Sequence, residues 1–208
     1  KYGLKFAVYL SPWDRSRAEY ATPDYLPYFY AQLRDLLTNY GEVFEVWFDG
    51  ANGGDGYYGG AKDQRTIDRK NYYNYPHIFK MLDEIQPNAV VFGDGGPGCR
   101  WVGNEKGFAG ETNWAFLRKG EVYPGYPNYH ELTYGHADGN QWTAAECDVS
   151  IRPGWFYHPE EDDKVKSPDQ LVDLYYRSVG HNATFLLNFP VDRDGLIHPI
   201  DSANAIAY

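Results

Sequence analysis

Short apolar runs alternate with longer amphipathic stretches along most of the chain. Each apolar run is bounded by polar residues, glycine or proline, which is typical of buried strands. The stretches between them repeat apolar side chains at helical spacing, as in Leu26, Leu33 and Leu37. The pattern predicts strands at residues 4–10, 43–48, 89–92, 143–149 and 184–189, and helices at residues 23–40, 78–85 and 167–179.

Two of the predicted helices carry start signals. Thr22 followed by Pro23 is a good cap and first helical residue for the first helix. Ser167, Pro168 and Gln170 give the third helix a capping box with proline at its first position. Continuous apolar strands that alternate with amphipathic helices predict parallel strands covered by helices, and therefore an α/β fold.

An open doubly wound sheet and a (β/α) barrel both fit this alternation. Polar and aromatic residues follow strand after strand, and in a barrel they would converge on the rim at the carboxyl ends of the strands. We therefore expect a (β/α)8-type, TIM-like barrel. A complete barrel takes about 250 residues, so we expect residues 1–208 to be a single catalytic barrel domain, incomplete at the N-terminus and part of a longer protein.

Charge and composition narrow the class of partner. The formal net charge of −10 and the sequence pI of about 5.0 argue against nucleic acid and against an anionic membrane surface. No apolar run reaches the length of a membrane span. The chain contains 20 Tyr and 6 Trp, whose flat rings suit the apolar faces of sugars, although any single tyrosine is more often part of a core.

Two carboxylic acids stand out as candidate catalytic residues. Asp49 ends an apolar strand in the stretch EVWFDGANG, and Glu105 follows a later strand in the glycine-containing stretch CRWVGNE. Retaining glycoside hydrolysis needs such a pair about 5 to 5.5 Å apart, one ionised and one protonated. We expect burial and a neighbouring negative charge to raise the proton affinity of Glu105, and Gly103 to let its loop fold closely over the site. No cofactor or metal is expected.

Four stretches in order resemble one family. VWFDGANG, GPGCRWVGNE, AAECDVSIRPGWFYH and LLNFPVDRDGLIHP are similar to glycoside hydrolase family 29, the α-L-fucosidases, and most of all to the subfamily that prefers α-1,3- and α-1,4-linked fucose. The resemblance covers essentially the whole chain. It implies a retaining exo-α-L-fucosidase with Asp49 as nucleophile and Glu105 as acid/base. Glu111 and Glu146 are the alternatives for the acid/base.

The resemblance also implies substrate-binding residues. Trp155 is expected to stack against fucose near its methyl group, and Tyr9 to reach the sugar or the nucleophile. Arg100 is expected to orient a carboxylate through its planar guanidinium, while Trp101 and Asn104 shape the acid/base loop. The full set of expected substrate-binding residues is Tyr9, Trp47, Arg100, Trp101, Asn104 and Trp155.

Some parts of the family pattern are missing from this sequence. The early strands with histidines that hold the fucose hydroxyls, and the β-sandwich after the barrel, have no counterpart here, so we expect weak fucose binding by this chain alone. The expected partner is a fucosylated oligosaccharide or glycoconjugate, and the resemblance implies a secreted or periplasmic protein. A glycan-binding barrel without turnover, and a glycosidase for another sugar such as a galactoside, remain alternatives; the oligomeric state is open.

Overall fold

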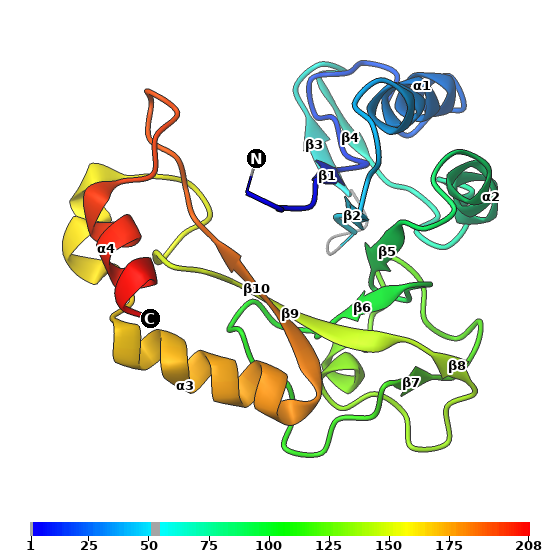
Figure 1. Ribbon diagram of the computed structural model, residues 1–208. Coiled ribbons are helices and arrows are strands. Elements are labelled where there is room, and N and C mark those ends of the chain that lie inside the picture. The colour runs from blue at the N-terminus through cyan, green and yellow to red at the C-terminus, as the bar shows by residue number, and fades with distance from the viewer. Residues whose placement is uncertain (1, 51–54) are drawn as a thin grey trace. The chain divides into compact units, whose positions relative to one another are not determined.

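The computed structural model describes residues 2–50 and 55–208, which form two compact units (Figure 1). The first unit contains the chain up to Arg100 and also Gly120–Pro127. The second contains Trp101–Lys119 and Asn128–Tyr208. The chain therefore leaves the first unit, returns to it for a short segment, and leaves again. The end of the VWFDGANG stretch, residues 51–53, lies outside the described residues.

Parallel strands build the first unit. They are β1 (Ala7–Leu10), β2 (Glu45–Phe48), β5 (Val90–Gly93) and the beginning of β6 (Cys99–Trp101), paired in that order. The strands pair in a register that aligns their carboxyl ends, with Tyr9 opposite Trp47 and Trp47 opposite Phe92. Residues that directly follow β2 and β5 consequently lie at the same edge of the sheet.

Helices lie in the connections from β1 to β2 and from β2 to β5, as is usual between parallel strands. α1 (Tyr25–Thr38) leads from β1 to β2, and α2 (Tyr75–Ile85) precedes β5, while β3 (Gly56–Tyr58) and β4 (Asp63–Arg65) form an antiparallel hairpin. One face of α1 is buried through Phe29, Leu33 and Leu37, and one face of α2 through Ile78, Met81 and Leu82.

The predicted cap of the first helix was wrong. The N-cap of α1 is Asp24, whose side chain makes no capping hydrogen bond. The hydroxyl of Thr22 instead donates to the carbonyl oxygen of Glu19 at 2.6 Å, so it belongs to the preceding turn. The capping box of the third helix is confirmed: the amide of Gln170 donates to the Ser167 hydroxyl, and the Gln170 side chain accepts from the Ser167 amide.

Tyrosines fill much of the core of the first unit. Tyr20 stacks on Tyr58 with ring centroids 4.1 Å apart, and its hydroxyl lies 2.5 Å from that of Tyr73. All three rings are buried, together with Tyr25 and Tyr75. The high tyrosine content therefore serves packing as much as any surface for sugars.

The second unit is built around β9 (Ala144–Ser150) and β10 (Ala183–Asn188), which pair in parallel along the whole of β10. Figure 1 shows α3 (Pro168–Ser178) running beside these strands. Val149, Ile151, Leu171 and Leu174 form the core between helix and strands. The remaining elements are α4 (Pro199–Ala207), the antiparallel pair β7 (Phe116–Leu117) and β8 (Gln141–Trp142), and 3-10 helices at Tyr129–Thr133, Pro159–Lys164 and Val179–His181.

The structure confirms the α/β class. The predicted strands correspond to β1, β2, β5, β9 and β10, each within a few residues of its predicted bounds. β6 was missed because its sequence, Cys-Arg-Trp, is short and lacks an apolar run. Closure of these strands into a barrel stays a prediction.

Candidate active site

Asp49 follows β2 directly and is held by Tyr9 from β1. The Tyr9 hydroxyl donates to Asp49 Oδ2 at 2.5 Å. Partial burial, together with the hydrogen bond to the Asp49 carboxylate, raises the pKa of Tyr9. The phenol therefore stays protonated and acts as a donor, which fixes the orientation of the Asp49 carboxylate.

Trp47 lies in a stack of three aromatic rings beside this carboxylate. Its indole stacks on Tyr9 with centroids 5.3 Å apart and on Phe92 with centroids 4.0 Å apart. The three residues face one another across β1, β2 and β5 because their positions are in register. Tyr9 is exposed and Trp47 half-buried, so the stack holds the Tyr9 ring in place while leaving it accessible.

Sequence reasoning missed a second carboxylic acid at this edge. Asp94 follows β5 as Asp49 follows β2, each two residues past the paired Phe92 and Trp47. It is 5% exposed, and burial raises its pKa to about 6, with a further contribution from the charge of Asp49. Its position after an apolar strand in FGDGG was the signal that could have identified it.

The loop that carries Glu105 belongs to the second unit. It begins at Val102, whose amide donates to the carbonyl oxygen of Glu146 at 3.1 Å. Gly103 has a φ of +82°, and a Cβ there would lie 2.2 Å from the Tyr129 carbonyl oxygen. The predicted need for glycine at this turn is confirmed. Glu105 itself is exposed, so the expectation that its side chain is buried was wrong.

Asn104 and Trp155 organise this loop. Asn104 donates to the Phe108 carbonyl oxygen and accepts from the Lys106 amide, both at 3.0 Å. The Trp155 indole N–H donates to Glu105 Oε2 at 3.4 Å. Trp155 is half-buried, and its carbonyl oxygen accepts from the Asn188 side chain at the end of β10. The structure thus brings together three of the predicted site residues in this unit.

Trp101 reaches a buried acid that sequence reasoning also missed. Its indole N–H donates to Asp148 Oδ1 at 2.9 Å. Asp148 lies in β9 and is 3% exposed. Burial raises the pKa of Asp148 to about 7, and the negative charges of Glu105 and Glu146 add to this rise. Asp148, and not Glu105, is therefore the buried one of these two carboxylic acids.

We expect replacement of Asp148 by Asn to raise the free energy of unfolding at pH 8 and to change it little at pH 4. Because the folded-state pKa of Asp148 is raised from 3.8 to about 7, the wild-type protein loses stability as the pH rises between these values, by up to about 4 kcal/mol at 1.36 kcal/mol per unit. The Asn oxygen can still accept from Trp101. Urea denaturation of both proteins at the two pH values measures the difference; a difference independent of pH would contradict the assignment.

The rival acids differ in their surroundings. Glu146 in β9 is buried and accepts from the Thr184 hydroxyl at 3.1 Å, whereas Glu111 is exposed.

Arg100 is fully buried, and its role in orienting a carboxylate stays a prediction. Tyr9, Trp47 and Asp49 lie together in the first unit, and Trp101, Asn104, Glu105 and Trp155 lie in the second.

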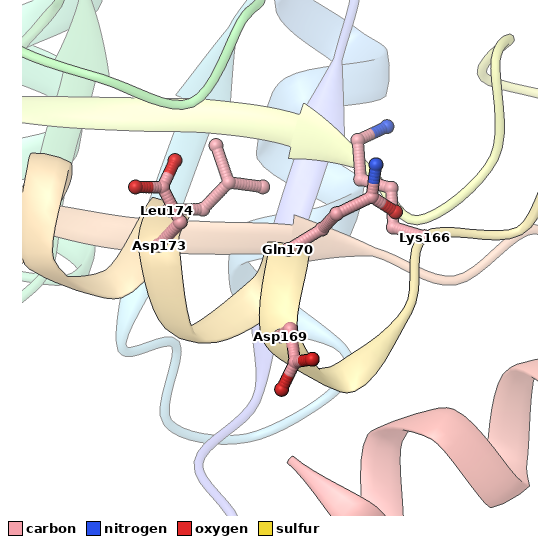
Figure 2. Close-up of a pocket in the computed structure, with 5 residues that line it drawn as sticks. All are labelled: Lys166, Asp169, Gln170, Asp173 and Leu174. Carbon is pink, nitrogen blue, oxygen red and sulfur yellow. The ribbon is translucent and has the colours of Figure 1, made fainter.

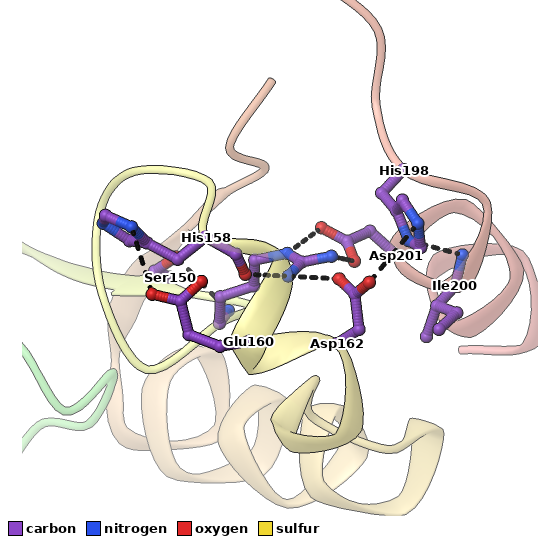
Figure 3. A network of polar contacts seen from close by, with 8 residues as sticks. Ser150, His158, Glu160, Asp162, His198, Ile200 and Asp201 are labelled. Atoms are coloured by element: carbon purple, nitrogen blue, oxygen red, sulfur yellow. Dashed lines mark hydrogen bonds and ion pairs between the residues drawn. The ribbon is translucent and has the colours of Figure 1, made fainter. Parts of the chain in front are cut away.

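A buried arginine holds the chain segment that leads into Trp155. Arg152 donates to both carboxylate oxygens of Asp201 at 2.8 Å and forms an ion pair with Asp162 at 2.9 Å (Figure 3). The hydrogen bonds to Asp201 raise the pKa of Arg152. His198 adds a contact to Asp162 at 3.7 Å. This network joins the residues after β9 to α4.

A surface hollow lies on α3 and the residues just before it (Figure 2). It is lined by Lys166, Asp169, Gln170, Asp173 and Leu174. The Lys166 ammonium is already engaged, since it donates to the Ser150 carbonyl oxygen at 2.6 Å.

Among the described helices, none combines the length and the apolar character needed to cross a membrane.

The chain matches the family model for α-L-fucosidase over residues 1–205. It is 43% identical to α-L-fucosidase 1 of Arabidopsis thaliana over 202 residues, which cover 96% of this chain and 37% of that protein. The chain therefore spans less than two fifths of the length of this curated relative.

Solved structures of glycoside hydrolase family 29 also match the chain. A glycoside hydrolase 29 family member from an unknown rumen bacterium shares 56% identity with a TM-score of 0.90, covering 98% of this chain and 36% of that one. A GH29 fucosidase of Ruminococcus gnavus, solved in complex with fucose, shares 29% identity with a TM-score of 0.76 over 98% of this chain and 44% of its own. The chain belongs to the α-L-fucosidase family, glycoside hydrolase family 29.

Proposed function

We propose that the whole protein is a retaining exo-α-L-fucosidase that removes terminal α-1,3- or α-1,4-linked fucose from oligosaccharides or glycoconjugates. Membership of the α-L-fucosidase family supports this activity. The single observation that carries the proposal is Asp49, a strand-end carboxylate oriented by the hydroxyl of Tyr9. The retaining course and the linkage follow from the sequence resemblance, and the retaining course is tested below by the configuration of an azide product.

In the first step the ionised Asp49 attacks the anomeric carbon of fucose. Tyr9 supports this role because its donated hydrogen bond orients the carboxylate. The bond from the anomeric carbon to the glycosidic oxygen breaks while Glu105 gives that oxygen a proton, so that the leaving sugar departs as a neutral alcohol. Fucose remains as an ester of Asp49.

In the second step Glu105, now ionised, takes a proton from water, and the water oxygen attacks the same carbon and displaces Asp49. Two inversions give overall retention of configuration. Asp148 supports this exchange of roles, because a neighbouring acid with a pKa of about 7 changes the field at Glu105 near neutral pH. Trp155 orients Glu105 through its indole N–H and is proposed to contact the fucose methyl group.

The substrate-binding roles of Trp47, Arg100, Trp101 and Asn104 belong to the same proposal. Trp47 holds the Tyr9 ring, Trp101 holds Asp148, and Asn104 fixes the backbone of the Glu105 loop. A secreted or periplasmic location fits an enzyme that acts on glycans outside the cytoplasm. Residues of the whole protein beyond this chain are proposed to supply the remaining contacts to fucose.

Replacement of Glu105 by Ala in the full-length enzyme tests the acid/base assignment. We expect kcat on a fucosylated trisaccharide to fall by about 10²- to 10⁴-fold. An aryl α-L-fucoside needs little acid assistance, so the ester of Asp49 should still form and azide should restore turnover. The product should be α-fucosyl azide, with the configuration of the substrate, identified by NMR spectroscopy.

The matched control is Glu111→Ala, which removes the exposed acid six positions further along. We expect this variant to keep near wild-type rates and to show no response to azide. Rescue by azide at Glu111 rather than Glu105 would move the acid/base role to Glu111. A full-length enzyme that binds fucose but releases none from either substrate would favour a glycan-binding protein, and cleavage of an aryl galactoside in place of the aryl fucoside would favour a galactosidase.

A further inference from the structure

The segment Gly120–Pro127 packs with the first unit, although the chain before and after it belongs to the second. We propose that this segment, called here the tyrosine segment, is the wall of the active site that binds the sugar to which fucose is attached, with the rings of Tyr123 and Tyr126 as its contact surface. This inference rests on the proposed function and names the part of the substrate that the segment recognises.

Asp94 anchors the tyrosine segment beside the nucleophile. Its Oδ2 accepts from the Gly125 amide at 2.7 Å, and the Tyr126 amide also bonds to this carboxylate. Asp94 and Asp49 occupy equivalent positions after the paired strands β5 and β2. A buried acid bonded to two successive backbone amides therefore fixes the segment at the edge where Asp49 lies.

Two glycines bring the backbones into direct contact. A Cβ on Gly50 would lie 3.1 Å from the Cβ of Pro124 and 3.6 Å from Asp94 Oδ2. A Cβ on Gly95 would lie 2.6 Å from the carbonyl oxygen of Val122, which a real side chain could not occupy without a shift of the backbone. The tyrosine segment is thus packed against the residue that follows the nucleophile in sequence.

A tight turn presents the two tyrosines together. The Tyr126 amide donates to the Tyr123 carbonyl oxygen at 2.9 Å, with Pro124 and Gly125 between them and a φ of +79° at Gly125. Proline followed by such a glycine is the pattern of a type II turn. The rings lie 5.8 Å apart edge to face, and the Lys70 ammonium lies 5.4 Å from the Tyr123 ring centroid.

Half-buried tyrosines of this kind suit the leaving sugar. Tyr123 and Tyr126 each keep part of the ring accessible, unlike the fully buried tyrosines of the core. A rigid aromatic ring can pack on the apolar C–H face of a sugar while its hydroxyl bonds to water or to the sugar. Loops at the rim of a rigid sheet are also the usual place for specificity.

The test compares two substrates of the full-length enzyme that share fucose and differ in the leaving group. α-L-Fucosyl fluoride has no second sugar, whereas an α-1,3/1,4-fucosylated trisaccharide has one. We expect Tyr123→Ala and Tyr126→Ala each to lower kcat/KM for the trisaccharide about tenfold, the order of one lost aromatic contact, and to leave the rate with the fluoride within about twofold.

Two further variants keep the comparison informative. Tyr123→Phe retains the ring and should keep most of the trisaccharide rate, even where the Ala variant folds poorly. Tyr40→Ala removes an exposed tyrosine just after α1 and should affect neither substrate. Equal losses on both substrates, or no loss on the trisaccharide, would overturn the inference while leaving the fucosidase proposal standing. Hydrolysis of neither substrate by the unmodified enzyme would overturn the proposed function itself.

Discussion

Replacing Asp49 by Ala in the full-length enzyme should lower kcat on a fucosylated trisaccharide by about 10⁴-fold or more, the order seen when a covalent nucleophile is removed. Without the carboxylate no ester of fucose can form, and the reaction loses its two-step path. Steady-state kinetics with the trisaccharide measure the loss. With an activated fucoside, azide should enter from the vacated face and give β-fucosyl azide, inverted relative to the substrate.

Tyr9→Phe is the matched control for this variant. It keeps the ring that stacks on Trp47 and removes only the hydroxyl that donates to Asp49. One hydrogen bond to a charged group contributes about 1.5 to 3 kcal/mol, so we expect a fall in kcat of about 10- to 100-fold, well short of the loss at Asp49. Equal rates for Asp49→Ala and the wild-type enzyme would end the assignment of the nucleophile.

Replacing Asp201 by Asn should lower the free energy of unfolding by about 3 to 5 kcal/mol, the cost typical of breaking a buried ion pair by removing one partner. Both Arg152 and Asp201 are almost fully buried, and they share two hydrogen bonds of 2.8 Å. The variant leaves the guanidinium charge without its main partner, since Asp162 is more exposed. Urea denaturation at pH 7 measures the loss.

The control for this prediction is an exposed ion pair on α3. Asp173 lies 3.5 Å from Arg177 with both side chains largely exposed, so Asp173→Asn should cost no more than about 0.5 kcal/mol. A similar small loss at Asp201 would show that the Arg152 network contributes little to stability. A large loss at Asp201 with a small loss at Asp173 would confirm that the buried pair contributes far more to stability than the exposed one.

The order and type of the main elements follow from local sequence. Apolar runs such as 43–48 and helical spacing such as that of Leu33 and Leu37 are strong signals, because burial of one face stabilises a single kind of element. β6 and β7 lack this signal: they have three and two residues and are defined by their pairing with β5 and β8. The cap at Thr22 failed because Ser, Thr and Asp bond equally well to turns before a helix.

In the candidate site, too, some features could be predicted from the sequence and others could not. Asp49 could be predicted because it ends a strand, and Glu105 because of its motif. The degree of burial could not be predicted, since it depends on loops that come from elsewhere in the chain. Asp94 is buried under Gly120–Pro127, and Asp148 lies behind Trp101. The pKa shifts therefore fall on acids next to the predicted pair.

The return of the chain to the first unit at Gly120–Pro127 has a consequence for biosynthesis. When synthesis has reached only Arg100, the ribosome has not yet added the amides that bond to the Asp94 carboxylate or the backbone that covers Gly95. At about 5 to 20 residues per second, a few seconds pass before Gly120–Pro127 is synthesised. During this time Asp94 and Gly95 lack the contacts that this segment supplies.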